Sequence, residues 1–134
     1  MYIRSFGFQC LFLSVLSSFV SADDLLPKNL AGRWTTFDEI YGGAASLKVD
    51  AEDPAKGRLT IWSNAPQCNV IDAPVTVTTA GKVIVAKVNS GYRNSCREDI
   101  TITLTRSDSA DEYVGEIRQD VPAHPELRVK LRPD

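Results

Sequence analysis

The chain has 134 residues, with 15 lysines and arginines against 17 aspartates and glutamates, three cysteines and a formal net charge of −2. The basic residues occur singly rather than in the clusters that follow a phosphate backbone, so we do not expect a nucleic-acid partner. After residue 22, no apolar stretch approaches the roughly 20 residues of a membrane-spanning helix, and we expect no membrane span.

The first 22 residues have the organisation of a secretory signal peptide. Arg4 supplies the positive charge, residues 8–20 form an apolar run, and residues 20–22 supply the small residues that a signal peptidase reads. We predict that residues 1–22 are cleaved and that residues 23–134 form a single domain. This domain has 14 basic and 17 acidic residues, a net charge of −3, because Arg4 is the only charged residue removed. We expect it to be monomeric and secreted or periplasmic.

Apolar and polar residues then alternate with the period of two that is typical of half-buried strands. Ile100, Ile102 and Leu104, for example, alternate with threonines. Turn residues separate the alternating runs, and the tightest turn, at Ala80-Gly81, is typical of a short hairpin. The pattern predicts eight strands, near residues 32–38, 44–51, 57–63, 74–79, 82–89, 99–106, 112–119 and 126–132.

Short antiparallel strands leave unpaired backbone groups at the edges of a sheet, and closing the sheet into a barrel removes those edges. Eight strands enclose an interior just wide enough for side chains or for one small ligand. Because short connections join nearly every pair of strands, we predict an all-β fold, an eight-stranded antiparallel up-and-down barrel. A two-sheet β-sandwich is the alternative, since the alternation is the same in both folds.

Two of the three cysteines remain after cleavage, because Cys10 lies within the signal peptide. An even pair of cysteines in an exported protein predicts a disulfide, here between Cys68 and Cys96. A zinc site would need histidine partners or closely spaced cysteines. Neither accompanies this pair, so we predict a structural disulfide and no metal.

The first and last predicted strands together resemble those of a known group of barrels. Gly32 and Trp34 form a Gly-x-Trp motif on the first strand, and the last strand bears three basic residues, Arg128, Lys130 and Arg132. These features resemble the calycins, which include the lipocalins and avidins. The resemblance implies an eight-stranded barrel that holds a small ligand, with Trp34 at one end and a last-strand basic residue packed across it. Trp34 is then either a core residue or a ligand contact.

A second tryptophan is out of phase with the apolar residues beside it. Leu59 and Ile61 share one face of their strand, so Trp62 is predicted to point outward or to flank the loop that leads to Cys68. An exposed tryptophan beside a loop is a common anchor of protein interfaces. Shielding of the disulfide is the alternative role for this side chain.

The polar segment 89–97 is expected to form a loop tied down by the disulfide. Tyr92 and Arg93 are of residue types enriched at protein interfaces. Ser-Gly-Tyr-Arg in this segment resembles the Ser-Gly-x-x-Arg-Tyr loop of bacterial lysozyme inhibitors. Residues 24–28 resemble the N-terminal trunk that secreted bacterial metalloprotease inhibitors insert into a protease cleft. Both resemblances imply an inhibitor of a hydrolase, and a solvated loop without a partner is the alternative.

Catalytic chemistry has little support in the sequence. His124 is the only histidine, it lies among prolines in the final turn, and no serine or cysteine nucleophile stands out beside a base. The acidic clusters lack the spaced aspartates of a calcium loop, and no glycine-rich phosphate loop is present. We therefore expect a protein that is not an enzyme and uses no cofactor.

Two functions remain open. The first is a secreted, non-enzymatic binding protein whose calycin-like barrel holds a small apolar ligand, with candidate contacts at Trp34, Trp62, Tyr92 and Arg93. The alternative is a secreted inhibitor of a protease or lysozyme that acts through residues 89–97 or the N-terminal arm. An open barrel interior would favour the first, whereas an interior filled by side chains would move the function to the loops.

Overall fold

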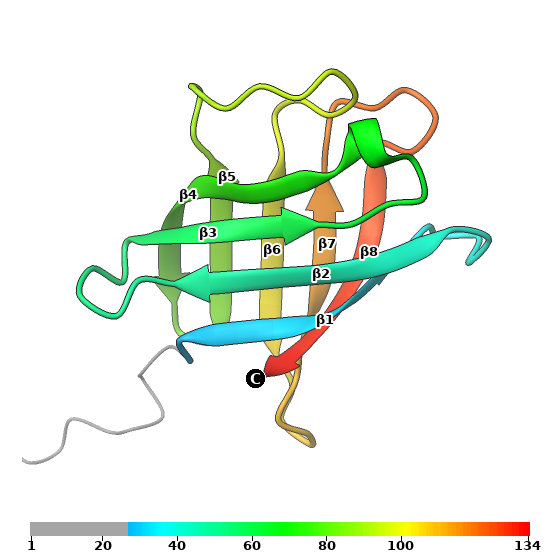
Figure 1. Ribbon diagram of the computed structural model, residues 1–134. Helices are drawn as coiled ribbons and strands as arrows, with labels where there is room; N and C mark the ends of the chain where they lie inside the picture. Colours follow the sequence, from blue (N-terminus) through cyan, green and yellow to red (C-terminus); the bar gives the residue numbers. More distant parts are fainter. Residues whose placement is uncertain (1–26) are drawn as a thin grey trace, which may run out of the picture.

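The computed structural model describes residues 27–134, which form a closed β-barrel (Figure 1). Each strand pairs antiparallel with the next, and β8 pairs with β1 to complete the ring. This architecture confirms the predicted all-β, eight-stranded up-and-down barrel and rules out the β-sandwich. The strands are β1 (Asn29–Thr35), β2 (Gly42–Val49), β3 (Lys56–Ile61), β4 (Val70–Ala80), β5 (Val83–Val88), β6 (Thr101–Arg106), β7 (Tyr113–Arg118) and β8 (Glu126–Pro133).

The predicted signal peptide, residues 1–22, and the N-terminal arm up to residue 26 lie outside the described residues. Between residues 27 and 134, no helix reaches the length and apolar character that crossing a bilayer demands. Cleavage at residue 22 and insertion of the arm into a cleft therefore stay predictions.

The fourth strand begins earlier than predicted, at Val70 instead of residue 74. Its first two inward residues are Val70 and Ala73, so a spacing of three interrupts the alternation. Asp72 between them has a φ of 48°, and the register between β3 and β4 shifts at this point. Such a bulge inserts an extra residue into one strand and interrupts the alternation. A search for strict alternation therefore does not detect the part of β4 that precedes residue 74.

Side chains fill the interior of the barrel. Every strand contributes at least two buried apolar residues to one continuous cluster. Leu47, Leu104 and Leu131, from different parts of the wall, each have 0% of their surface exposed. An eight-stranded barrel is just wide enough to be packed in this way. The centre of the barrel is therefore a hydrophobic core. Because it is filled, we look for the candidate site at the ends of the barrel.

The connections divide the barrel into two ends (Figure 1). At one end, which we call the loop end, four connections of six to twelve residues follow β1, β3, β5 and β7, at residues 36–41, 62–69, 89–100 and 119–125. The connection 62–69 contains η2 (Pro66–Cys68), a short 3-10 helix. At the opposite end, which we call the turn end, connections of two to six residues follow β2, β4 and β6, at residues 50–55, 81–82 and 107–112.

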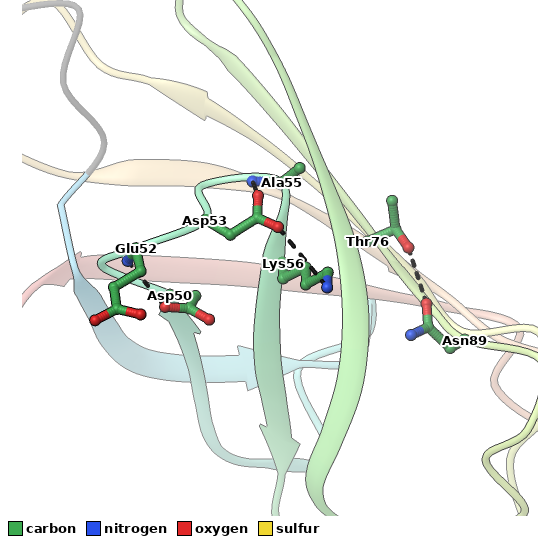
Figure 2. A network of polar contacts seen from close by, with 7 residues as sticks. All are labelled: Asp50, Glu52, Asp53, Ala55, Lys56, Thr76 and Asn89. Atoms are coloured by element: carbon green, nitrogen blue, oxygen red, sulfur yellow. Dashed lines mark hydrogen bonds and ion pairs between the residues drawn. The ribbon is translucent and has the colours of Figure 1, made fainter.

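Two turns at the turn end have features that depend on residues close in sequence. Gly81 has a φ of 59° in the two-residue connection between β4 and β5, which confirms the tight hairpin predicted there. In the turn before β3, Asp50 and Asp53 each accept a hydrogen bond from the backbone N–H two residues further on, at 2.9 and 3.1 Å (Figure 2). Lys56 adds an ion pair to Asp53 at 3.8 Å.

Candidate ligand-binding pocket

A disulfide between Cys68 and Cys96 joins two of the four connections at the loop end. It confirms the predicted pairing and attaches η2 to the loop between β5 and β6. Asn94 supports the same link, because its side-chain N–H donates to the carbonyl of Asn69 at 2.6 Å. Its side-chain oxygen accepts the backbone N–H of Cys96 at 2.8 Å. The two loops are therefore held together before any partner binds, which lowers the entropy that binding must remove.

The loop end contains a pocket of about 260 Å³, which we call the end pocket. Most of its wall is apolar and includes the two disulfide-bonded cysteines together with Trp34, Tyr41, Ala65, Val121 and Leu127. The polar part of its wall includes Thr36, Arg97, Gln119 and His124. Ligand sites in proteins commonly combine an apolar lining with a few polar groups in this way.

Trp34 belongs both to the barrel core and to the lining of the end pocket. Its side chain is 5% exposed, and its indole N–H donates to the carbonyl of Trp62 at 2.7 Å. Gly43 makes this arrangement possible, because a Cβ atom there would lie 2.2 Å from the Trp62 carbonyl oxygen and 2.8 Å from the indole nitrogen. Trp34 thus lies at one end of the barrel, where the Gly-x-Trp resemblance implied that it would be.

Three polar residues are buried at the loop end: Thr36, Arg97 and Gln119, which are 2%, 7% and 6% exposed. The Nε of Arg97 donates to the carbonyl of Cys68 at 2.8 Å, and a terminal guanidinium N–H donates to the side-chain oxygen of Gln119. Gln119 donates in turn to the carbonyl of His124 at 2.8 Å. Because buried polar groups are costly when unpaired, this network holds three loops in one arrangement.

The cation packed against Trp34 does not come from the last strand. The guanidinium carbon of Arg97 lies 5.7 Å from the centroid of the Trp34 ring, whereas that of Arg128 lies 4.7 Å from the ring of Phe37. The calycin resemblance implied a last-strand residue in this place, so this detail differs. The β8 residue opposite Trp34 is the buried Val129, and the basic residues of β8 alternate with it on the outer face.

The loop between β1 and β2 is shaped by a threonine–aspartate pair. The hydroxyl of Thr36 donates to the carboxylate of Asp38, which also accepts the backbone N–H of Ile40 at 3.2 Å. These hydrogen bonds lower the pKa of Asp38 below its usual value of 3.8, because they favour the ionised carboxylate. The loop brings Tyr41 against His124 in an edge-to-face arrangement, with ring centroids 5.3 Å apart. The histidine is therefore a packed part of the pocket wall.

Large apolar side chains remain exposed close to the end pocket. Three lie on or next to the β1–β2 loop and one follows β3; we call them the apolar rim, and they are Phe37, Ile40, Tyr41 and Trp62. Their exposed fractions are 43%, 70%, 50% and 46%. Trp62 thus points outward, as its phase relative to Leu59 and Ile61 indicated. Several large apolar side chains exposed at one end of a small domain are typical of interaction sites.

The two remaining predicted contacts, Tyr92 and Arg93, line a neighbouring hollow of about 290 Å³ beside the β5–β6 loop. Tyr92 is half-buried against the core, and Arg93 is exposed. Arg97 lines both this hollow and the end pocket. The structure therefore brings Trp34 and Trp62 together at one place and Tyr92 and Arg93 together at another, with Arg97 between them.

The buried polar residues of the pocket were not identified from the sequence. Thr36 and Gln119 each continue the inward phase of a strand, since they follow the buried Trp34 and Ile117 by two residues. A polar residue at an inward position just past the end of a strand could therefore have indicated these two buried polar residues. Arg97 offered no such signal, because the loop before β6 has no periodicity.

Among residues 27–134, no three histidine, cysteine, aspartate or glutamate side chains gather closely enough to hold a metal ion. Comparison of the chain with protein-family models, with curated proteins and with solved structures finds no match. The eight-stranded antiparallel barrel fits a calycin-like fold. We therefore infer the function from the geometry and chemistry of the loop end.

Proposed function

We propose that this protein is a non-enzymatic binding protein that holds a small, mainly apolar ligand in the end pocket. The observation that carries the proposal is the mainly apolar pocket at the mouth of a barrel whose centre is packed. Its volume of about 260 Å³ suits a small organic molecule. Arg97 and Gln119 supply the few polar groups that orient a ligand in such sites.

The proposed site differs from the one expected from the sequence, which placed the ligand inside the barrel. Inward side chains occupy that interior, and Trp34 connects it to the pocket because it belongs to both. The disulfide is compatible with a periplasmic or extracellular location. We propose that the protein binds its ligand in that location, after removal of residues 1–22.

Titration of the purified, disulfide-bonded protein with the neutral fluorescent probe N-phenyl-1-naphthylamine tests the proposal. We expect saturable binding at one site per chain. Ala65→Phe fills the pocket from its wall and should weaken binding by about tenfold or more. Ala110→Phe adds the same side chain at an exposed position of the turn end and should leave the affinity unchanged.

Urea unfolding of both variants shows whether the barrel is intact in each. The proposal is contradicted if the unaltered protein shows no saturable binding. It is also contradicted if the two folded variants bind the probe equally well.

The apolar rim supports a second candidate function, inhibition of a secreted hydrolase. Four large apolar side chains exposed on one end of a small barrel form a surface suited to a protein partner. The β5–β6 loop lies at the same end and is fixed by the disulfide, and it presents Arg93 to solvent. Rigid loops of this kind bind a cleft without a large loss of conformational entropy.

A panel of secreted proteases and lysozymes, each assayed with excess protein, tests this second function. Loss of inhibition in Trp62→Ala would assign the contact to the apolar rim. Loss in the pair Tyr92→Ala and Arg93→Ala would assign it to the β5–β6 loop. If the unaltered protein inhibits no member of the panel, this function is contradicted, while the small-ligand proposal is unaffected.

A further inference from the structure

We propose that the ligand of the end pocket is a small organic acid, whose apolar body contacts the pocket wall and whose carboxylate binds the guanidinium of Arg97. The inference rests on the proposed function and adds the charge of the ligand to it. It follows from the burial of Arg97, from its hydrogen-bond partners and from the absence of a compensating charge among residues 27–134.

Arg97 is a buried cation with donors left over. Arg97 is 7% exposed, and it lines both the end pocket and the neighbouring hollow. A guanidinium has five N–H donors, and two of them here bind the carbonyl of Cys68 and the side-chain oxygen of Gln119. Both acceptors are neutral, so neither compensates the positive charge.

Among residues 27–134, no carboxylate forms an ion pair with Arg97; the ion pairs of this part of the chain use Lys56, Lys82, Arg118 and Arg132. Burial lowers the pKa of Arg97, which is the effect of removing a charge from water without a neighbouring opposite charge. Glu98 and Asp99 are exposed and line the neighbouring hollow, not the end pocket. Because an unpaired buried charge is unfavourable, the pocket favours an anion.

The surroundings of Arg97 favour an acid with an apolar body over a hydrated inorganic anion. The guanidinium carbon lies 5.7 Å from the centre of the Trp34 ring, and Val121 and Leu127 line the same pocket. A small inorganic ion would leave this apolar surface uncovered. A planar guanidinium can donate two parallel hydrogen bonds to a carboxylate, so charge and apolar contact can be satisfied by one molecule.

Matched ligands that differ only in charge test the inference on the unaltered protein. Isothermal titration with 3-phenylpropionate and with 3-phenylpropanamide compares a carboxylate with a neutral group of the same shape. We expect the acid to bind about tenfold more tightly, since hydrogen bonds to charged groups are the stronger ones. A second pair, a tripeptide ending in phenylalanine with a free or an amidated C-terminus, distinguishes a small acid from the end of a polypeptide as the source of the carboxylate.

Arg97→Gln should reduce the preference for the acid to within about twofold, because it removes the charge and retains polar groups. Arg33→Gln is the matched control, since it removes an exposed arginine that neighbours Trp34 on β1 and does not line the pocket. It should leave the preference unchanged. If Arg97→Gln does not fold, the comparison of acid with amide on the unaltered protein decides the matter.

Tighter binding of 3-phenylpropionate than of its amide supports the inference. A preference for the free carboxylate in the peptide pair alone overturns the small acid and assigns the carboxylate to the end of a polypeptide. Equal binding of acid and amide in both pairs overturns it and leaves the end pocket as a site for neutral apolar ligands. Failure of all four ligands and of the neutral probe contradicts the proposed function itself.

Discussion

The two ends of the barrel are built from the same eight strands but are stabilised differently. At the turn end, the ion pair between Lys82 and Asp108 has side chains that are 59% and 82% exposed. At the loop end, the corresponding contacts are buried, since Arg97 and Gln119 are less than a tenth exposed and Cys68 is 8% exposed. Solvent screens the first kind of contact and leaves the second kind strong.

The loop end also bears features that lower stability. It holds a buried arginine with no carboxylate partner among residues 27–134, and it exposes the four side chains of the apolar rim. Departures from the pattern of a stable fold tend to gather where a protein binds something. We therefore propose that binding takes place at the loop end, and we predict that substitutions there have larger effects than substitutions at the turn end.

Removal of the disulfide should have the largest effect. Cys68→Ser combined with Cys96→Ser opens a link between residues 28 apart, which should lower the free energy of unfolding by about 3 kcal/mol. Urea unfolding of the variant, compared with the oxidised protein, measures the difference. Binding of the neutral probe should fall as well, because the two cysteines line the end pocket. A variant as stable as the parent would show that the loop end does not depend on this link.

Gly43→Ala should have the next largest effect. The added Cβ atom would lie 2.2 Å from the carbonyl oxygen of Trp62 and would force apart the contact with the Trp34 indole. Overpacking of this kind lowers the free energy of unfolding by about 2 kcal/mol. Thermal unfolding measures it, with Gly91→Ala as the control because no atom lies within 4 Å of a Cβ there. Equal stability of the two variants would contradict the tight packing around Trp34.

Lys82→Ala at the turn end should change stability by at most about 1 kcal/mol, because its ion pair with Asp108 is exposed. Urea unfolding at low and high salt checks this, and the small difference should shrink further as salt is added. A loss comparable to that of the disulfide variant would remove the contrast between the two ends.

Acid should loosen the β1–β2 loop locally. The pKa of Asp38 is lower in the folded state, so its ionised carboxylate stabilises the loop at pH values above about 3.8. That contribution is lost as the pH falls through the lower folded-state pKa. The amide signal of Ile40, which donates to this carboxylate, should shift over that range in an NMR titration. The shift should be absent in Asp38→Asn, and a shift that persists would assign it to another group.

Much of the barrel was predictable because side chains on a strand point alternately to its two faces. Ile102 and Leu104 are buried and the threonines between and beside them are less so, as the alternation indicates. The start of β4 was not predictable in this way, since its bulge depends on pairing with β3. Trp34 and Trp62 were recognised from motif and phase, but their hydrogen bond joins residues 28 apart and follows from the pairing of both β1 and β3 with β2.

Local pattern was enough for the number and order of the strands, for the hairpin at Gly81 and for the single pair of cysteines, because each depends on neighbouring residues or on a count. The end pocket required the closed barrel. Its arginine lies in a loop without periodicity, and it is buried only because the disulfide and Gln119 hold that loop across the mouth of the barrel. Burial of a loop side chain depends on what surrounds it in space, and a loop sequence contains no repeating signal of those surroundings.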